Sequence, residues 1–65
     1  MREKYTVIIV QAYESETPQG QLTDNCTIEL ITTDPEVALA KAKKLVSKKH
    51  YRVGSIIERF HDAKS

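Results

Sequence analysis

The sequence lacks the features that mark several large classes of protein. Its 65 residues contain one cysteine, no tryptophan, and only two glycines and two prolines. A single cysteine cannot form an intrachain disulfide, so we expect a reducing, cytoplasmic setting. A membrane-spanning helix needs about 18 successive apolar residues, and the sequence has no run of that length. The amino end, MREKYTV, does not have the pattern of a secretory signal. The sequence therefore predicts a cytoplasmic protein with no membrane partner.

Net charge is also scarce, because the formal total is only +1. This near-neutral balance does not by itself favour nucleic acid or a membrane surface. The distribution is uneven, however. Residues 1–40 hold two basic and seven acidic residues, a net charge of −5, whereas residues 41–65 hold eight basic and two acidic residues, a net charge of +6. The chain is dipolar, so its basic end can attract an acidic partner.

The length predicts a single domain over residues 1–65, since independent domains usually run about 50–200 residues. Such a chain buries only about 60% of the surface that its unfolded form exposes. There is room for one helix on one small sheet and none for a cleft between two lobes.

Residues 4–13 form the most strand-like segment, with β-branched and aromatic residues and no glycine or proline. Four successive apolar positions, 7–10, are typical of a strand that is buried on both faces and therefore central. Alternation places two sets of side chains on opposite faces. One set is Ile8, Val10 and Ala12, and the other is Tyr5, Val7, Ile9 and Tyr13.

Residues 14–25 are polar, are interrupted by Pro18 and Gly20, and predict a loop that is either mobile or functional. A second strand is expected at 26–32 and a third at 51–60, followed by a polar tail at 61–65. In the third strand, plain alternation puts Val53 and Ile57 on one face. A bulge at Gly54 would shift the register between the two halves.

The segment Thr33-Asp34-Pro35-Glu36 predicts the start of a helix over 34–48. Thr33 and Glu36 have the spacing of a capping box. Alternatively, Asp34 is the cap and Pro35 takes the first helical position. Apolar residues at 38, 39, 42, 45 and 46 form one stripe, as expected for a helix that lies on a sheet.

These elements predict an α+β fold of ββαβ order, with a three-stranded antiparallel sheet of strand order 2-1-3 and the helix on one face. One helix covers only one side of such a sheet. The other side would expose the set Tyr5, Val7, Ile9 and Tyr13. Because monomers seldom expose so large an apolar patch, we expect a homodimer or a docking surface for another macromolecule. The alternative is that the loop or the tail folds over this face.

A basic patch is expected around the end of the helix. Its members are Lys41, Lys44, Lys48, Lys49 and Arg52, with Tyr51 among them. Such a patch suits an acidic protein surface, and it also suits nucleic acid, where a tyrosine can stack on a base. The alternative is a solvated helix flank whose lysines complement the helix dipole.

Catalytic chemistry is poorly represented, and the sequence predicts a protein that is not an enzyme. His50, His61 and Asp62 are the groups with acid–base potential, but no nucleophile is placed beside them. Cys26 begins a strand and is expected to be a small buried hydrophobe. We predict no catalytic residue, no metal site and no cofactor.

The helix segment TTDPEVALAKAKKL and the closing strand YRVGSIIERF complete a pattern that resembles the small ββαβ proteins of phages and mobile elements, some anti-CRISPR proteins among them. This resemblance is architectural and assigns no residue a role. It implies a small non-enzymatic module that occupies a surface of a nucleic-acid-binding effector complex. The predicted function is accordingly an interaction module that uses the basic helix flank and the apolar sheet face. The alternatives are a nucleic-acid-binding module using residues 41–52 and a structural homo-oligomer.

Overall fold

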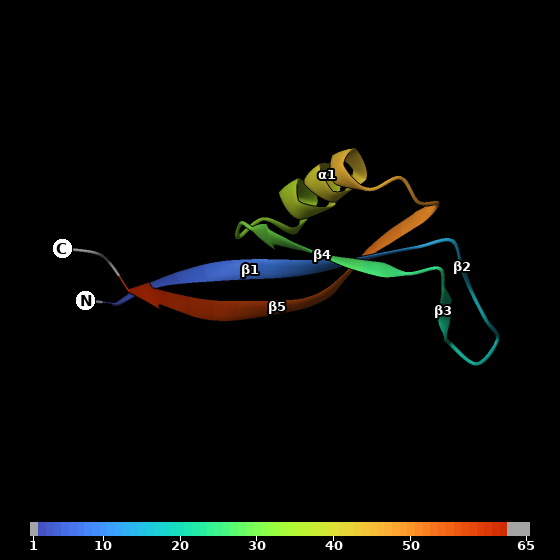
Figure 1. Cartoon of the computed structure of the whole chain (residues 1–65), viewed down its shortest axis with the longest axis horizontal. Coiled ribbons are helices and arrows are strands. Elements are labelled where there is room, and N and C mark those ends of the chain that lie inside the picture. The colour runs from blue at the N-terminus through green and yellow to red at the C-terminus, as the bar shows by residue number, and fades with distance from the viewer. Residues whose placement is uncertain (1, 63–65) are drawn as a thin grey trace.

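The computed structural model describes residues 2–62 as one sheet, one helix and a small hairpin. The elements are β1 (Arg2–Tyr13), β2 (Ser15–Glu16), β3 (Leu22–Thr23), β4 (Cys26–Ile31), α1 (Pro35–Leu45) and β5 (His50–Asp62) (Figure 1). The three-stranded sheet has the order β4-β1-β5, and both neighbouring pairs are antiparallel. The predicted α+β fold, with the first strand central and one helix on one face, is confirmed.

The paired ends of β1 and β5 extend farther than the sequence pattern indicates. β1 begins at Arg2, and β5 continues to Asp62, so it includes part of the expected tail. Exposed ion pairs join the two strands there, at 3.6 Å between Arg2 Nε and Asp62 Oδ1 and 2.9 Å between Lys4 Nζ and Glu58 Oε2. Residues 63–65 of the predicted tail lie outside the described residues.

Residues 14–25, expected to be a loop, contain the hairpin of β2 and β3. Pro18 and Gly20 build its turn: the Gly20 N–H donates to the Thr17 carbonyl at 2.9 Å, and Gly20 has a φ of 88°. Proline at the second turn position and a left-handed glycine after it are typical of a three-residue hairpin loop. Figure 1 shows the hairpin leaving the far end of the sheet, away from the termini. It does not fold across the sheet.

Local capping determines both ends of α1. Asp34 is the N-cap, since its Oδ1 accepts from the Glu36 N–H at 3.0 Å, and Pro35 takes the first turn. The second of the two predicted starts is therefore observed. The helix ends at Leu45 instead of residue 48, because Val46 is extended and its carbonyl accepts from the Tyr51 hydroxyl.

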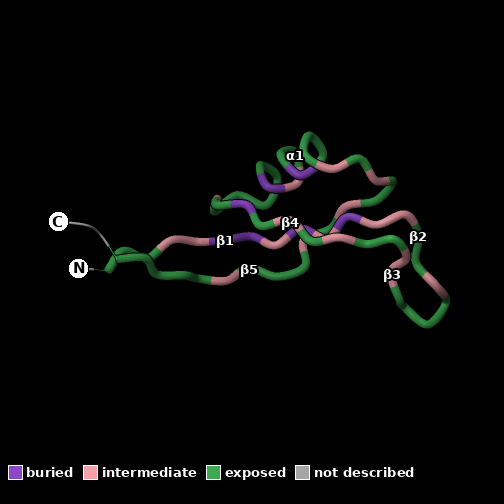
Figure 2. The backbone as a smooth tube through the Cα atoms, in the orientation of Figure 1, coloured by how far each residue is buried: buried purple, intermediate pink, exposed green. Residues whose placement is uncertain are grey.

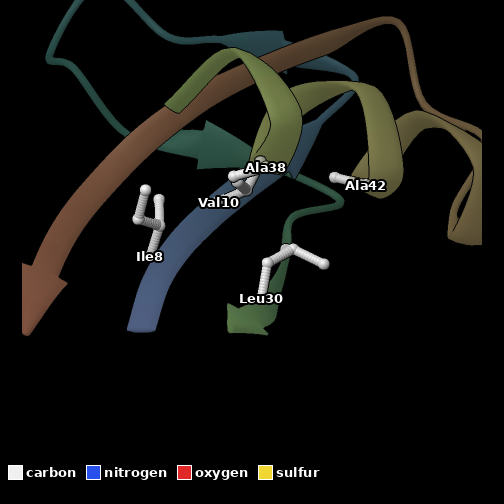
Figure 3. Packing of buried hydrophobic residues seen from close by; sticks show 5 residues of the cluster. All are labelled: Ile8, Val10, Leu30, Ala38 and Ala42. Carbon is white, nitrogen blue, oxygen red and sulfur yellow. The ribbon is translucent and has the colours of Figure 1, made fainter. Parts of the chain in front are cut away.

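The core lies between α1 and the face of the sheet that it covers (Figures 2 and 3). Its buried members are Ile8, Val10, Leu30, Ala38 and Ala42. The alanines present small side chains to the sheet, which lets the helix axis approach the strands closely. The sheet is covered only where α1 passes over it, and the start of β1 extends beyond the helix (Figure 1).

A bulge at Gly54 sets the register of β5. Ser55 pairs with Ile9 and Val53 with Val10, so Gly54 is the extra residue. A Cβ on Gly54 would lie 3.1 Å from Gln11 Cγ, so the backbone approaches closely there. The plain alternation of the third strand is corrected: Val53 and Ile56 face the helix side, opposite Val10 and Ile8, and Ile57 lies on the other side, opposite Val7.

The molecule is long for its size. Its radius of gyration is 14.0 Å and its extents are 49 × 24 × 16 Å. A compact chain of this length has a radius of about 11 Å. The difference arises because the β1–β5 ribbon projects at one end and the hairpin at the other (Figure 1).

Candidate functional site

The side of the sheet opposite α1, which we name the open face, is covered by no other described element. Cross-strand register assigns its side chains. They are Glu3, Tyr5, Val7, Ile9, Gln11 and Tyr13 of β1, Thr27, Glu29 and Ile31 of β4, and His50, Arg52, Ser55, Ile57, Arg59 and His61 of β5. The predicted docking set of Tyr5, Val7, Ile9 and Tyr13 thus lies together on one face.

Polar side chains cover the centre of the open face. Arg59 Nη2 lies 2.9 Å from Glu29 Oε2, an ion pair that joins β5 to β4. Arg59 sits opposite Tyr5 and Glu29 opposite Ile9, so the pair crosses β1 over Val7. Val7 is only 2% exposed for this reason. The expectation that Val7 offers contact area to a partner is corrected, because its side chain is buried beneath the Arg59–Glu29 pair.

At the end near the hairpin, Tyr13, His50, Arg52 and Gln11 form a cluster. The rings of Tyr13 and His50 are stacked, with centroids 5.3 Å apart. The Arg52 guanidinium carbon lies 5.7 Å from the Tyr13 ring centroid, and Arg52 Nε donates to Gln11 Oε1 at 2.9 Å. These contacts hold an aromatic ring and a cation in a fixed arrangement at the surface.

At the opposite end, Tyr5, Ile31 and His61 line an open depression of about 320 Å³. The Tyr5 and His61 rings meet edge to face at 6.2 Å. His61 Nε2 lies 3.6 Å from Glu3 Oε1. Ile31 is 70% exposed, so its aliphatic side chain is available for contact. This end of the open face can accept an apolar group.

The predicted basic patch is divided between two sides of the molecule. Lys41, Lys44 and Lys49 are exposed near the end of α1. Lys48 is only 20% exposed in its side chain, and its Nζ lies 3.2 Å from Asp24 Oδ2. Arg52 is not beside these lysines, because alternation in β5 places it on the open face. The grouping of Arg52 with the helix lysines is therefore corrected.

Tyr51 has a structural role at the junction of α1 and β5. It packs against the core, and its hydroxyl accepts from the Lys48 N–H at 2.8 Å and donates to the Val46 carbonyl. The ammonium of Lys43 lies 5.9 Å from the ring centroid. Tyr51 links the end of α1 to β5 through its hydroxyl, and stacking of its ring on a partner stays a prediction.

We expect Tyr51→Phe to lower the free energy of unfolding by about 1–2 kcal/mol, because the backbone groups of Val46 and Lys48 lose their partner. Denaturant unfolding followed by circular dichroism measures the change. Tyr13→Phe is the matched control, since the Tyr13 hydroxyl bonds to no other residue in 2–62. Its effect should stay within about 0.5 kcal/mol. Equal losses in the two variants would contradict the role given to Tyr51.

The sequence interpretation missed Arg59, Glu29 and Gln11 as parts of this surface. The usable signal was the opposite charge of Glu29 and Arg59, on the two strands that flank the central one. The sequence alone could not show that these residues share a face, because the bulge at Gly54 changes the register of β5.

Two further features were sought within residues 2–62, a metal-ligand cluster and a membrane-spanning helix. No group of three or more histidine, cysteine or acidic side chains is placed to hold a metal ion there. No helix in this range is long and apolar enough to cross a bilayer. Comparison with protein families, curated proteins and solved structures finds no match to the chain.

Proposed function

We propose that the chain is a small non-catalytic interaction module that binds a protein partner through the open face. The observation that carries the proposal is the composition of this face: it lacks a covering element among the described residues, yet it presents aromatic, aliphatic and arginine side chains. Tyrosine and arginine are enriched among the residues that dominate binding energies at interfaces. A surface selected for solvation alone would present mainly lysine and glutamate.

The arrangement of the face supports the same proposal. Arg52 and Tyr13 are held by neighbours on the same surface, so little side-chain freedom is lost on binding. The exposed lysines of the α1 flank lie on the other side of the sheet. In the proposal they steer an acidic partner toward the molecule.

The cellular setting in the proposal is cytoplasmic, supported by the lone cysteine, Cys26, which is free. The mode of action agrees with what the resemblance to small phage ββαβ proteins, anti-CRISPR proteins among them, implies: occupation of another molecule's surface without catalysis. A second copy of the chain can be the partner, which gives a homodimer. Native mass measurement at micromolar concentration distinguishes this case from a heterologous partner.

The proposal is tested with a partner that is captured with the tagged chain, identified, purified and titrated by calorimetry. We expect Arg52→Glu to raise the dissociation constant about tenfold, since arginine is among the residue types that most often dominate interface energies. Lys44→Glu is the matched control, because it makes the same charge change on the helix flank. It should weaken binding by about threefold or less, with a strong salt dependence.

Two results would contradict the proposal. Equal weakening by Arg52→Glu and Lys44→Glu removes the open face as the binding surface. Purified nucleic acid that binds the chain with an affinity that falls steeply with salt, and that depends on Lys41, Lys44 and Lys49, favours the nucleic-acid module instead.

A further inference from the structure

The two strands that flank β1 differ in length, and this leaves part of the central strand with one free edge. β5 pairs with β1 from Arg2 to Tyr13, whereas β4 pairs with it only from Val7 to Ala12. The segment Arg2–Thr6, which we name the open edge, therefore has no strand partner on the β4 side within the described residues. About half of its backbone N–H and C=O groups point to that side.

The chain itself explains why the open edge exists. β4 would continue along β1 if the chain ran straight on past Ile31, but it bends at residue 33. Instead the Asp34 N–H donates to Thr32 Oγ1 at 3.1 Å, Asp34 caps α1, and Pro35 begins the helix. The chain therefore turns out of the sheet directly after Ile31, and Pro35, which has no N–H for a sheet ladder, lies in the helix.

We propose that the open edge binds an extended peptide segment of the partner, which adds to the sheet as a strand in line with β4. This rests on the proposed function and names the part of the partner that is recognised. Strand addition supplies affinity through main-chain hydrogen bonds and specificity through pockets for alternate side chains. Free main-chain groups and a pocket for a side chain are adjacent here, because the depression between Tyr5, Ile31 and His61 lies beside the open edge on the open face.

The side chains of the open edge define the sequence that it accepts. Tyr5 and Glu3 point to the open face, while Lys4 and Arg2 point to the helix side. A segment parallel to β4 places successive residues opposite Thr6, Tyr5, Lys4, Glu3 and Arg2. Directly opposed residues interact most strongly. The matching segment therefore has an apolar residue at its second position, followed by acidic, basic and acidic residues.

A second copy of the chain is a poor occupant of the open edge. Symmetric antiparallel pairing requires one residue to face its own copy. With Lys4 or Glu3 at that position, like charges are opposed, which is destabilising. With Tyr5 at that position, Glu3 of the copy would occupy the place that Ile31 already holds opposite Val7. Charged edge residues that prevent self-pairing are a common device of natural sheets.

In the test, the synthetic peptide acetyl-Thr-Ile-Glu-Lys-Glu-amide is titrated into the ¹⁵N-labelled chain. Binding is measured by NMR, from the amide chemical shifts of the chain and from its amide hydrogen exchange. We expect saturable shifts and slowed exchange at Arg2–Thr6. A peptide with lysine in place of both glutamates should bind about threefold more weakly. Two further peptides are N-methylated at every second backbone nitrogen, one at the odd positions and one at the even positions. One of them should not bind and the other should still bind, because only one of the two sets of peptide N–H groups faces β1.

Two chain variants complete the test. Ile31→Asn should raise the dissociation constant about tenfold, and Leu45→Asn, at a similarly exposed aliphatic residue of α1, should leave it unchanged. Absence of shifts at Arg2–Thr6, or equal effects of the two N-methylation patterns, overturns the proposal. If the amide shifts at Arg2–Thr6 change with the concentration of the chain when no peptide is present, the open edge binds a second copy of the chain and the proposal is overturned. Because the partner titration uses Arg52 at the other end of the open face, failure at the open edge leaves the proposed function standing.

Discussion

Replacing Ile8 with alanine is expected to lower the free energy of unfolding by about 2–5 kcal/mol. Ile8 is fully buried and lies between Leu30 of β4 and Ile56 of β5, beneath α1. Removing its side chain leaves a cavity in the centre of the sheet, where strand pairing on both sides limits collapse. A chain of 65 residues has a total stability of about 3–10 kcal/mol, so the variant should be close to unfolding.

Urea unfolding measured by circular dichroism gives this loss directly. Ile31→Ala is the matched control, because it removes the same atoms from a residue that is 70% exposed and one strand away. Its effect on stability should stay within about 0.5 kcal/mol. If the two variants were equally stable, the core would not lie where the structure places it.

Enlarging the helix side of the same core should also be costly. Ala38→Leu is expected to reduce stability by about 1–3 kcal/mol. Ala38 is fully buried in the contact between α1 and the sheet, and Figure 3 shows it above Val10. A leucine there has no space to enter, so α1 must move away from the strands and lose contact along its length.

Thermal and urea unfolding again give the measurement. Ala40→Leu tests the same substitution at an exposed position of the same helix, where leucine and alanine differ little in helix propensity. We expect its stability to change by less than about 0.5 kcal/mol. A destabilised Ala40→Leu variant would attribute the effect to the helix itself, not to the helix–sheet contact.

The sequence was sufficient to predict the fold because its strongest local patterns agree with one another. Four successive apolar residues identified β1 as central, and the Asp34-Pro35 pair located the start of α1. The hairpin of β2 and β3 was missed because its strands are short and polar, with no alternation to detect. Proline and glycine at the right spacing were its one usable signal.

The site was predictable only in part. Alternation along β1 correctly grouped Tyr5, Ile9 and Tyr13, since it depends on one strand alone. The positions of Arg52 and Arg59 depend on how β5 pairs with β1, and a bulge of one residue reverses the side to which later side chains point. The cover that Arg59 and Glu29 provide for Val7 follows from that pairing, which no local pattern contains.

The pairing of β1 with β5 also has a kinetic consequence. It joins residues at opposite ends of the described chain, such as Arg2 with Asp62, and it is the most extensive strand contact in the molecule. Folding must therefore close a very large loop before β1 gains its second neighbour, and such non-local pairing slows folding. During synthesis, β1 leaves the ribosome before β5, so its apolar side chains stay exposed to non-native contacts until β5 has been made.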